Sequence, residues 1–381
     1  MEKAILWASI FVSFVFSFCQ AEVRYTVTDL GTIGGELSYA LDINDKGQIV
    51  GYSKTAEGAY HGFLYDNGTM TDLGTLGGGH SDAQAINNNG QITGSAWNSE
   101  GDIHPFLSDG MTLTDLGTLG ERFSYAYGIN DSGHVVGKER ASVPFLYDGI
   151  QMISLASLIG ESGCAYDINN HGHIVGSASN YHAFLYDGTS VTDLGTLGGL
   201  VSTANSINNY GFIVGSSSTG DDLGTHAFLY DGTNMIDLGT LRGSYASAED
   251  INDNGQIVGS SVIEGDDENP VYHAFLYNST EGMLDLNDLI SHDSGWILNG
   301  AGGINASGQI VGHGMIESEN HAFLLTPVPE PATLLLLSLG AFLAGRRRNT
   351  RAEKVSSNSE SRRKEQGRES LFVLKWLKDL G

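Results

Sequence analysis

The sequence predicts an all-β protein, a seven-bladed β-propeller built from four-stranded antiparallel blades. Three observations lead to this fold class. The 381 residues include 52 glycines but only 6 prolines, a composition that favours turns and leaves extended segments uninterrupted. One pattern of short apolar runs and turns recurs seven times between residues 25 and 325. Its period, 39 to 53 residues of short strands and turns, is typical of propeller blades.

Residues 1–21 are predicted to be a secretory signal peptide. An apolar run, residues 4–18, is followed by Ala21, which ends a small-x-small cleavage context. Cys19 offers the alternative of a lipoprotein anchor, but bulky phenylalanines in residues 16–18 precede it where small residues are needed. Cleavage after Ala21 is therefore expected.

Each copy contains a tight first hairpin. An Ile-Asn pair opens its turn, and a glycine always lies eight residues after the isoleucine. Asparagine favours such a turn, and the turn glycine takes the left-handed backbone conformation at no steric cost. An alanine three residues before each isoleucine predicts that this strand is innermost, where a crowded channel requires small side chains. The isoleucines are Ile43, Ile86, Ile129, Ile168, Ile207, Ile251 and Ile304.

A second hairpin joins a phenylalanine run to an Asp-Leu pair, so that each copy has four strands. The distance from the glycine of the first hairpin to this phenylalanine varies from 8 to 16 residues. Length variation is tolerated in exposed loops but not within a ladder, which identifies the second-to-third connection as an exposed loop. The phenylalanines are Phe63, Phe106, Phe145, Phe184, Phe228, Phe275 and Phe323.

The two ends of the repeat complement each other. The last copy contains Ile304, Gly312 and the run 321–325, but no Asp-Leu strand follows. The missing strand is present at the other end, in residues 25–30. Pairing these segments closes a ring and avoids two unpaired sheet edges. A β-solenoid is the alternative architecture, but it would not need the orphan strand.

The body of the chain is strongly acidic. Residues 22–328 carry 7 Lys and Arg against 38 Asp and Glu, a net charge of about −31. Such a surface repels phosphate backbones, so nucleic acid is not an expected partner. Without the leader, Cys164 is the only cysteine, and no internal disulfide is expected.

One turn is similar to the beginning of a calcium-binding loop. Asp250, Asn252 and Asn254 place side-chain oxygens at alternate positions before a glycine. Ser261, however, lies where a bidentate glutamate is wanted, and a simple turn explains the asparagine and glycine in every copy. The turn is the simpler explanation, with calcium at these three residues as the alternative, and no other cofactor is expected.

Histidine and aspartate recur in six copies, which raises the question of catalysis. Adjacent blades hold such residues too far apart for the ~2 Å bonds of a zinc site, and glycoside hydrolases need two carboxylates about 5 to 9 Å apart in one cleft. A residue copied into six blades is expected to serve the blade, by packing or by bonding turn amides. No catalytic residue is therefore assigned. The histidines are His61, His104, His182, His226, His273 and His321, and the aspartates are Asp29, Asp72, Asp115, Asp193, Asp237 and Asp285.

The repeat resembles a known family. Residues 182–188, His-Ala-Phe-Leu-Tyr-Asp-Gly, residues 192–199, Thr-Asp-Leu-Gly-Thr-Leu-Gly-Gly, and the Ile-Asn-x-x-Gly turn are similar to the HAF extracellular repeats of bacteria. The resemblance covers residues 25–325. It implies secretion and repetition, and it carries no catalytic residues.

The composition changes after Thr326. A Pro-Glu-Pro motif, an apolar segment over residues 332–345 and an arginine cluster follow one another, and together they resemble a PEP-CTERM sorting signal. The resemblance implies a transient inner-membrane anchor through a transmembrane helix, cleavage by an exosortase-type protease, and a Gram-negative bacterium that makes exopolysaccharide. The apolar segment is shorter than the ~20 residues of a typical span. The sorting residues are Pro329, Glu330, Pro331, Arg346, Arg347 and Arg348.

These features divide the chain into four parts. A signal peptide, residues 1–21, precedes the seven-repeat propeller, residues 22–326. The sorting and transmembrane segment, residues 327–348, is followed by a charged extension, residues 349–381, which is expected to be disordered.

The predicted function is that of an exported binding module at the cell surface or in the extracellular matrix, without catalysis. The variable second-to-third connections and the fourth-to-first connections alternate with the tight turns, so both emerge on one face. This face is predicted to bind a polysaccharide, a cation-bridged ligand or a surface protein. The alternatives are a propeller-type glycoside hydrolase or lyase and a purely structural matrix protein, because a fold alone assigns no function. The longest connections contribute Asp221, Asp222, Glu264, Asp266, Asp267 and Glu268.

Overall fold

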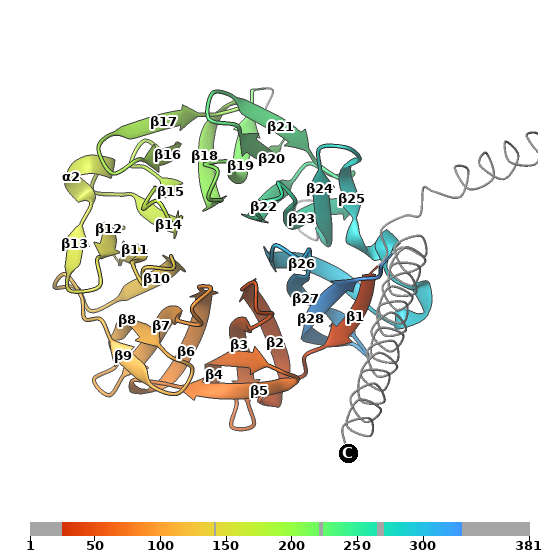
Figure 1. The fold of residues 1–381 in the computed structure, drawn as a ribbon, viewed down its shortest axis with the longest axis horizontal. Helices are drawn as coiled ribbons and strands as arrows, with labels where there is room; N and C mark the ends of the chain where they lie inside the picture. Colours follow the sequence, from red (N-terminus) through yellow and green to blue (C-terminus); the bar gives the residue numbers. More distant parts are fainter. Residues whose placement is uncertain (1–24, 141, 221–223, 265–269, 330–381) are drawn as a thin grey trace, which may run out of the picture. The chain divides into compact units, whose positions relative to one another are not determined.

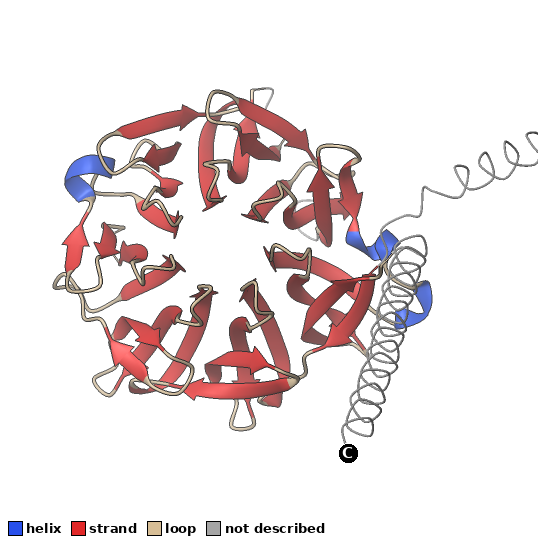
Figure 2. Cartoon of the chain, in the orientation of Figure 1, coloured by secondary structure: helices blue, strands red, loops and turns tan. Residues whose placement is uncertain are grey.

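Seven blades of four antiparallel strands stand around a central axis (Figure 1). One parallel bridge, between Leu37 and Asn320, joins the first and last blades into an eight-stranded sheet. The computed structural model describes residues 25–329 apart from 141, 221–223 and 265–269. Within these residues, strands predominate, and the helical elements are α2 (Ala156–Ile159) and two 3-10 helices, η1 (Leu286–Leu289) and η2 (His292–Ser294) (Figure 2). The prediction of a seven-bladed propeller is confirmed, and the β-solenoid alternative is wrong.

The first four blades follow the chain in order. Blade 1 consists of β2 (Gly34–Ile43), β3 (Ile49–Thr55), β4 (Tyr60–Asp66) and β5 (Thr69–Gly74). Blade 2 consists of β6 (Gly77–Ile86), β7 (Ile92–Asn98), β8 (Ile103–Ser108) and β9 (Leu113–Asp115). Blade 3 consists of β10 (Ser124–Ile129), β11 (Val135–Glu139), β12 (Pro144–Tyr147) and β13 (Met152–Ser154). Blade 4 consists of β14 (Cys164–Ile168), β15 (Ile174–Ser177), β16 (Ala183–Tyr186) and β17 (Val191–Gly195).

The last three blades complete the ring. Blade 5 consists of β18 (Gly198–Ile207), β19 (Ile213–Thr219), β20 (Thr225–Tyr230) and β21 (Met235–Gly239). Blade 6 consists of β22 (Ala246–Ile251), β23 (Ile257–Glu264), β24 (Val271–Asn278) and β25 (Gly282–Asp285). Blade 7 consists of β26 (Ile297–Ile304), β27 (Ile310–Ile316), β28 (Glu319–Pro327) and the amino-terminal strand β1 (Tyr25–Asp29).

Strand β1 supplies the fourth strand of blade 7, as the orphan segment predicts. It pairs antiparallel with β28, from Tyr25 opposite Pro327 to Asp29 opposite Phe323. The next residue extends the ladder, because the Leu30 N–H donates to the Ala322 carbonyl at 3.0 Å. The first and last strands of the described chain thus share one sheet.

A ring of buried asparagines ties the seven tight turns together. In each Ile-Asn pair, the asparagine Oδ1 accepts the N–H groups two and four residues later, as Asn44 does from Lys46 and Gln48 at 3.0 Å. Its Nδ2 donates to the main-chain carbonyl of the equivalent asparagine in the next blade. The seven donations run in order through Asn44, Asn87, Asn130, Asn169, Asn208, Asn252 and Asn305 and return to Asn44.

The glycine after each first hairpin marks a close approach of two strands. A Cβ on Gly51 would collide with the carbonyl oxygen of Tyr39, because β2 bulges between Ala40 and Asp42. The innermost position of the first strand is as predicted (Figure 1), but the reason for its alanine is different. These alanines are buried between neighbouring blades: Ala83 abuts Gly62 of the preceding sheet.

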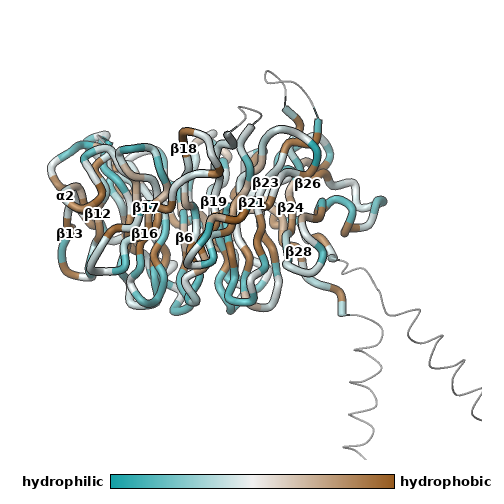
Figure 3. Tube along the Cα trace, turned by 90° about the horizontal axis from the view of Figure 1, so that it is seen from above, coloured by the Kyte–Doolittle hydropathy of each residue, from teal (hydrophilic) through white to brown (hydrophobic). Residues whose placement is uncertain are grey.

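The core is divided into clusters that lie between adjacent blades. One cluster joins Val50 and Leu73 of blade 1 to Ile92 and Phe106 of blade 2, and all four side chains are buried. Seen from the side, the turns along the lower face are mostly hydrophilic (Figure 3). Because consecutive strands are antiparallel, the tight turns lie on one face and the variable connections lie on the opposite face, which we call the variable-loop face.

No helix among the described residues is long and apolar enough to cross a membrane. The predicted signal peptide, the predicted membrane segment 332–345 and the extension 349–381 lie outside the described residues. They therefore stay predictions. Of the sorting residues, Pro329 is the last one described, whereas Glu330, Pro331, Arg346, Arg347 and Arg348 are not described.

Candidate functional site

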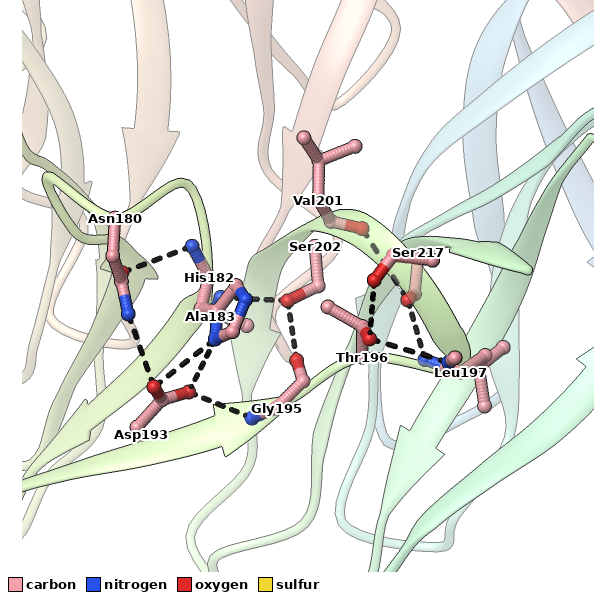
Figure 4. Close-up of polar contacts among 12 residues, drawn as sticks. Asn180, His182, Ala183, Asp193, Gly195, Thr196, Leu197, Val201, Ser202 and Ser217 are labelled. Atoms are coloured by element: carbon pink, nitrogen blue, oxygen red, sulfur yellow. Dashed lines mark hydrogen bonds and ion pairs between the residues drawn. The ribbon is translucent and has the colours of Figure 1, made fainter. Parts of the chain in front are cut away.

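The repeated histidines and aspartates form pairs between the third and fourth strands of a blade. His182 Nδ1 lies 3.0 Å from the Asp193 carboxylate, which also accepts the Gly195 N–H at 2.8 Å (Figure 4). Burial raises the pKa of Asp193, but the bonds from Gly195 and His182 outweigh this effect and lower the pKa below its usual value. The same pair recurs as His61–Asp72, His104–Asp115, His226–Asp237, His273–Asp285 and, across the ring closure, His321–Asp29.

For three of the six pairs, a buried serine connects the pair to the next blade; these serines are Ser38, Ser81 and Ser202. Ser202 Oγ accepts the Ala183 N–H at 2.8 Å and donates to the Gly195 carbonyl at 2.6 Å (Figure 4). Ser38 makes the equivalent bonds to Ala322 and Gly31, and so fastens blade 1 to the closing strand. The repeated polar residues thus join the third and fourth strands of a blade and, through Ser38, Ser81 and Ser202, adjacent blades.

The candidate calcium ligands are all engaged in hydrogen bonds. Asp250 accepts the N–H groups of Ile251 and Ile304 at 2.7 and 2.8 Å. The Asn252 Oδ1 faces two N–H groups of its own turn, and Asn254 Nδ2 donates to the Ala306 carbonyl at 2.9 Å. In the part of the chain that the structure describes, no group of three or more His, Cys, Asp or Glu residues is arranged to hold a metal ion.

Three carboxylates, those of Asp42, Asp167 and Asp250, lie on innermost strands, each two residues before an asparagine of the ring. Asp42 accepts the N–H of its neighbour Ile43 at 2.7 Å and that of Ile86, in the next blade, at 2.8 Å. Burial raises the pKa of Asp42 to about 7, and the nearby Asp250 carboxylate adds to the effect. Burial likewise raises the pKa of Asp167 to about 6 and raises that of Asp250. Each carboxylate bridges two blades at an electrostatic cost that increases with pH.

The acidic loop residues are only partly described. Glu264 lies at the end of β23 and is exposed on the variable-loop face. Asp221, Asp222, Asp266, Asp267 and Glu268 lie outside the described residues, so their contribution to a binding surface is still a prediction.

A cleft of about 610 Å³ opens between blades 1 and 2 on the variable-loop side of the channel. Five rings that line it succeed one another at short distances, and we call them the aromatic row. Their centroids are 5.4 Å apart for Trp97 and His80, 6.2 Å for His80 and Tyr60, 6.1 Å for Tyr60 and Tyr52, and 5.0 Å for Tyr52 and Tyr39. Trp97 and Tyr60, at 39% and 40% exposure, present the most accessible faces.

Polar groups lie beside the aromatic row. The Asp82 carboxylate accepts a hydrogen bond from Gln84 Nε2 at 3.0 Å, and both residues line the cleft. Burial raises the pKa of Asp82 to about 6, although hydrogen bonds from Gln84 and the Ser95 backbone act in the opposite direction. His80 Nδ1 accepts the Tyr60 N–H at 3.1 Å, so the neutral ring carries its proton on Nε2.

Sequence reasoning missed this cleft because it concentrated on what the copies share. Two cleft positions, the residue before the repeat alanine and the residue after the first-hairpin glycine, differ from copy to copy. The first is Tyr39 in blade 1, Asp82 in blade 2 and Thr203 in blade 5, and the second is Tyr52 in blade 1 and Ser216 in blade 5. The available signal was the departure of the first copies from the pattern.

The arrangement contains the chemical groups that can bind a saccharide. Aromatic faces bind the apolar faces of sugar rings, while carboxylate, amide and hydroxyl groups bond the sugar hydroxyls. Asp82 is the only carboxylate among the described residues that line the cleft. Hydrolysis of a glycosidic bond generally uses a pair of carboxylates.

Two segments of the chain match family models. Residues 237–322 match "Protein of unknown function (DUF3466)", and residues 327–348 match the PEP-CTERM protein-sorting motif. A PEP-CTERM motif is a sorting signal processed by exosortase. It indicates an exported protein that is sorted to the cell surface of a Gram-negative bacterium.

The solved structures that are similar share little sequence with this chain, and no curated protein matches it significantly. YCF48 bound to D1 peptide is 11% identical, with 82% of this chain and 97% of that chain covered and a TM-score of 0.46. A mutant Aleuria aurantia lectin in complex with alpha-methyl-L-fucoside is 14% identical, with 67% and 96% covered and a TM-score of 0.35. A mutant of AofleA from Arthrobotrys oligospora is 8% identical, with 80% and 92% covered and a TM-score of 0.36. The chain thus contains a segment that matches DUF3466, residues 237–322, and a PEP-CTERM motif, residues 327–348.

Proposed function

We propose that this protein is an exported, surface-associated binding module without catalytic activity, and that it binds extracellular polysaccharide in the aromatic cleft. The observation that carries the proposal is the aromatic row beside Asp82 and Gln84, on a rigid scaffold of paired strands. The similarity of the repeats to HAF extracellular repeats fits a role outside the cell. The sorting motif adds an exosortase-type protease as the processing partner.

The acidic surface and the cleft together argue against the other candidate ligands. A net charge of −26 for the whole chain disfavours nucleic acid. A calcium ion in this turn would need side-chain oxygens free to bind it, whereas the Asp250 carboxylate and the Asn252 Oδ1 accept internal hydrogen bonds. We therefore propose direct binding of the saccharide, without a cofactor.

The test is a glycan array probed with the full-length exported protein, with and without calcium. The wild-type protein is expected to bind neutral glycans in both conditions. Trp97→Ala, which removes the outer ring of the aromatic row, is expected to weaken binding about tenfold or more, because burial of an aromatic side chain contributes on the order of 1.5–3 kcal/mol. Tyr210→Ala is the matched control, because Tyr210 is 74% exposed in a tight turn on the opposite face.

Three results would contradict the proposal. If no glycan on the array bound, a purely structural role would be the better explanation. Binding that Trp97→Ala does not weaken would place the ligand elsewhere on the molecule. Conversion of a bound glycan to shorter or unsaturated products would show an enzyme.

A further inference from the structure

A second cavity, of about 430 Å³, adjoins the aromatic cleft, and Tyr39 lines both. Blades 6 and 7 supply the rest of its wall, which includes Tyr272, Asn299, His313 and Met315. The ring centroids of Tyr39 and His313 are 4.5 Å apart. The line of rings therefore continues across Tyr39 into the second cavity without a gap.

The extended line of rings is longer than one sugar. From Trp97 through Tyr39 to His313, consecutive centroids lie 4.5–6.2 Å apart, and the residues come from blades 2, 1 and 7. A pyranose ring is similar in size to one aromatic ring, so a monosaccharide covers only one member of the line. Full occupancy of both cavities requires several linked units.

Resting on the proposed function, we infer that the aromatic cleft and the second cavity form one groove that binds an internal stretch of a neutral polysaccharide, several units long. The lining of the groove comes mainly from blades 2, 1, 7 and 6 and contains both aromatic rings and polar side chains. Asn299, whose Nδ2 donates to the Tyr272 carbonyl at 3.2 Å, supplies a polar amide side chain to the second cavity. Gln84 supplies one to the first.

The charges of the residues that line the two cavities favour a neutral polymer. No lysine or arginine is found among the described residues that line either cavity. Burial lowers the pKa of His313 to about 4, so its ring carries no positive charge at neutral pH. An acidic polysaccharide would bring its carboxylates next to Asp82 and into a strongly acidic surface, with no cation in the lining to pair with them.

The experiment measures affinity against chain length with the full-length protein. The probes are neutral gluco-, manno-, galacto- and xylo-oligosaccharides of two, four and six units, and oligogalacturonates of the same lengths. For at least one neutral series, we expect the six-unit member to bind about tenfold or more tightly than the two-unit member. We expect no binding of the oligogalacturonates.

Substitutions in the two cavities separate their contributions. His313→Ala is expected to weaken binding of the six-unit probe about tenfold and to leave binding of the two-unit probe unchanged. Trp97→Ala is expected to weaken both. His313 lies on β27 opposite Gly300 of β26, and its replacement can disturb this strand pairing. A second variant, Asn320→Ala in the lining of the same cavity, is therefore expected to show the same selectivity if His313→Ala does not fold.

The outcomes distinguish this inference from the proposed function. Equal affinity for two and six units, with loss of both on Trp97→Ala, would overturn the extended groove and keep the single cleft. Preference for oligogalacturonates would overturn the neutral ligand. Absence of binding to every probe would overturn the proposed function itself.

Discussion

Replacement of Leu30 by alanine tests whether the amino-terminal strand is part of the fold. Leu30 follows β1, is 5% exposed, and packs in a cluster with Phe63 of blade 1 and Val311 of blade 7. Leu194 occupies the equivalent place in the fourth strand of blade 4, where it is 7% exposed in a cluster with Phe228. One leucine reaches its core across the ring closure, and the other belongs to a continuous copy.

If β1 stabilises blade 7 as its fourth strand, Leu30→Ala and Leu194→Ala should lower the free energy of unfolding by similar amounts. A buried Leu→Ala change costs about 2–5 kcal/mol, as a lost transfer free energy plus a cavity. For a protein somewhat larger than 250 residues, 1 kcal/mol corresponds to roughly 2 °C in Tm. Both Leu30→Ala and Leu194→Ala should therefore lower the Tm by about 4–10 °C.

Thermal unfolding followed by circular dichroism measures these shifts, and unfolding in guanidinium chloride checks them. Leu200→Ala is the control for an exposed leucine, since Leu200 on β18 of blade 5 is 83% exposed and its replacement should leave the Tm unchanged. The reasoning is refuted if Leu30→Ala melts with the wild-type protein while Leu194→Ala melts several degrees lower.

Three further predictions concern polar groups. The pKa of Asp42 is raised from 3.8 to about 7 in the folded protein, so the free energy of unfolding should fall as the pH rises from about 4 to about 7. Asp42→Asn should make this fall smaller in a pH series of denaturant titrations, and an unchanged pH dependence would contradict the raised pKa of Asp42. Ser202→Ala leaves a buried N–H and a carbonyl without their partner and should lower the free energy of unfolding by about 1–3 kcal/mol. His182→Ala breaks a partly exposed pair and should lower it by about 1 kcal/mol or less. The reverse order in the same titrations would mean that the His182–Asp193 pair contributes more to stability than Ser202 does. Asn208→Ala removes one link of the asparagine ring together with the two turn bonds and should destabilise the protein by about 3 kcal/mol or more. Tyr210→Ala, two residues away and 74% exposed, should stay within about 0.5 kcal/mol of the wild type. Equal Tm values for the two variants would show that the asparagine ring does not hold the blades together.

The fold could be predicted from the sequence because its information is local and repeated. The Ile-Asn turn specifies a hairpin by the chemistry of a few adjacent residues, and seven copies of it leave few architectures. Even the long-range contact at the closure is visible, because no fourth strand follows residues 321–325 and a surplus strand is present at residues 25–30. The pairing His321–Asp29 completes the same pattern across the ring.

The candidate site could not be predicted in the same way. Tyr39, Tyr60 and Trp97 come from three different strands, and only the packing of blade 1 against blade 2 aligns their rings. In blade 5, Thr203 and Ser218 occupy the positions of Tyr39 and Trp97, whereas tyrosine recurs at the position of Tyr60 in blades 4 and 6. Asp250 shows the opposite case: its spacing with Asn252 fits a calcium loop, but the side chains are directed at backbone N–H groups of adjacent blades and of the turn itself.

Intrinsic fluorescence tests the central claim, saccharide binding on the aromatic row, most directly. Trp97 is 39% exposed in the cleft, whereas Trp296 is 9% exposed and packs against Phe323 at 6.0 Å. Titration of the full-length protein with the neutral hexasaccharide that binds best should change the tryptophan emission, and Trp97→Phe should abolish the change while Trp296→Phe preserves it. An emission change of equal size in Trp97→Phe, or unchanged wild-type emission at saturating saccharide, would contradict the account.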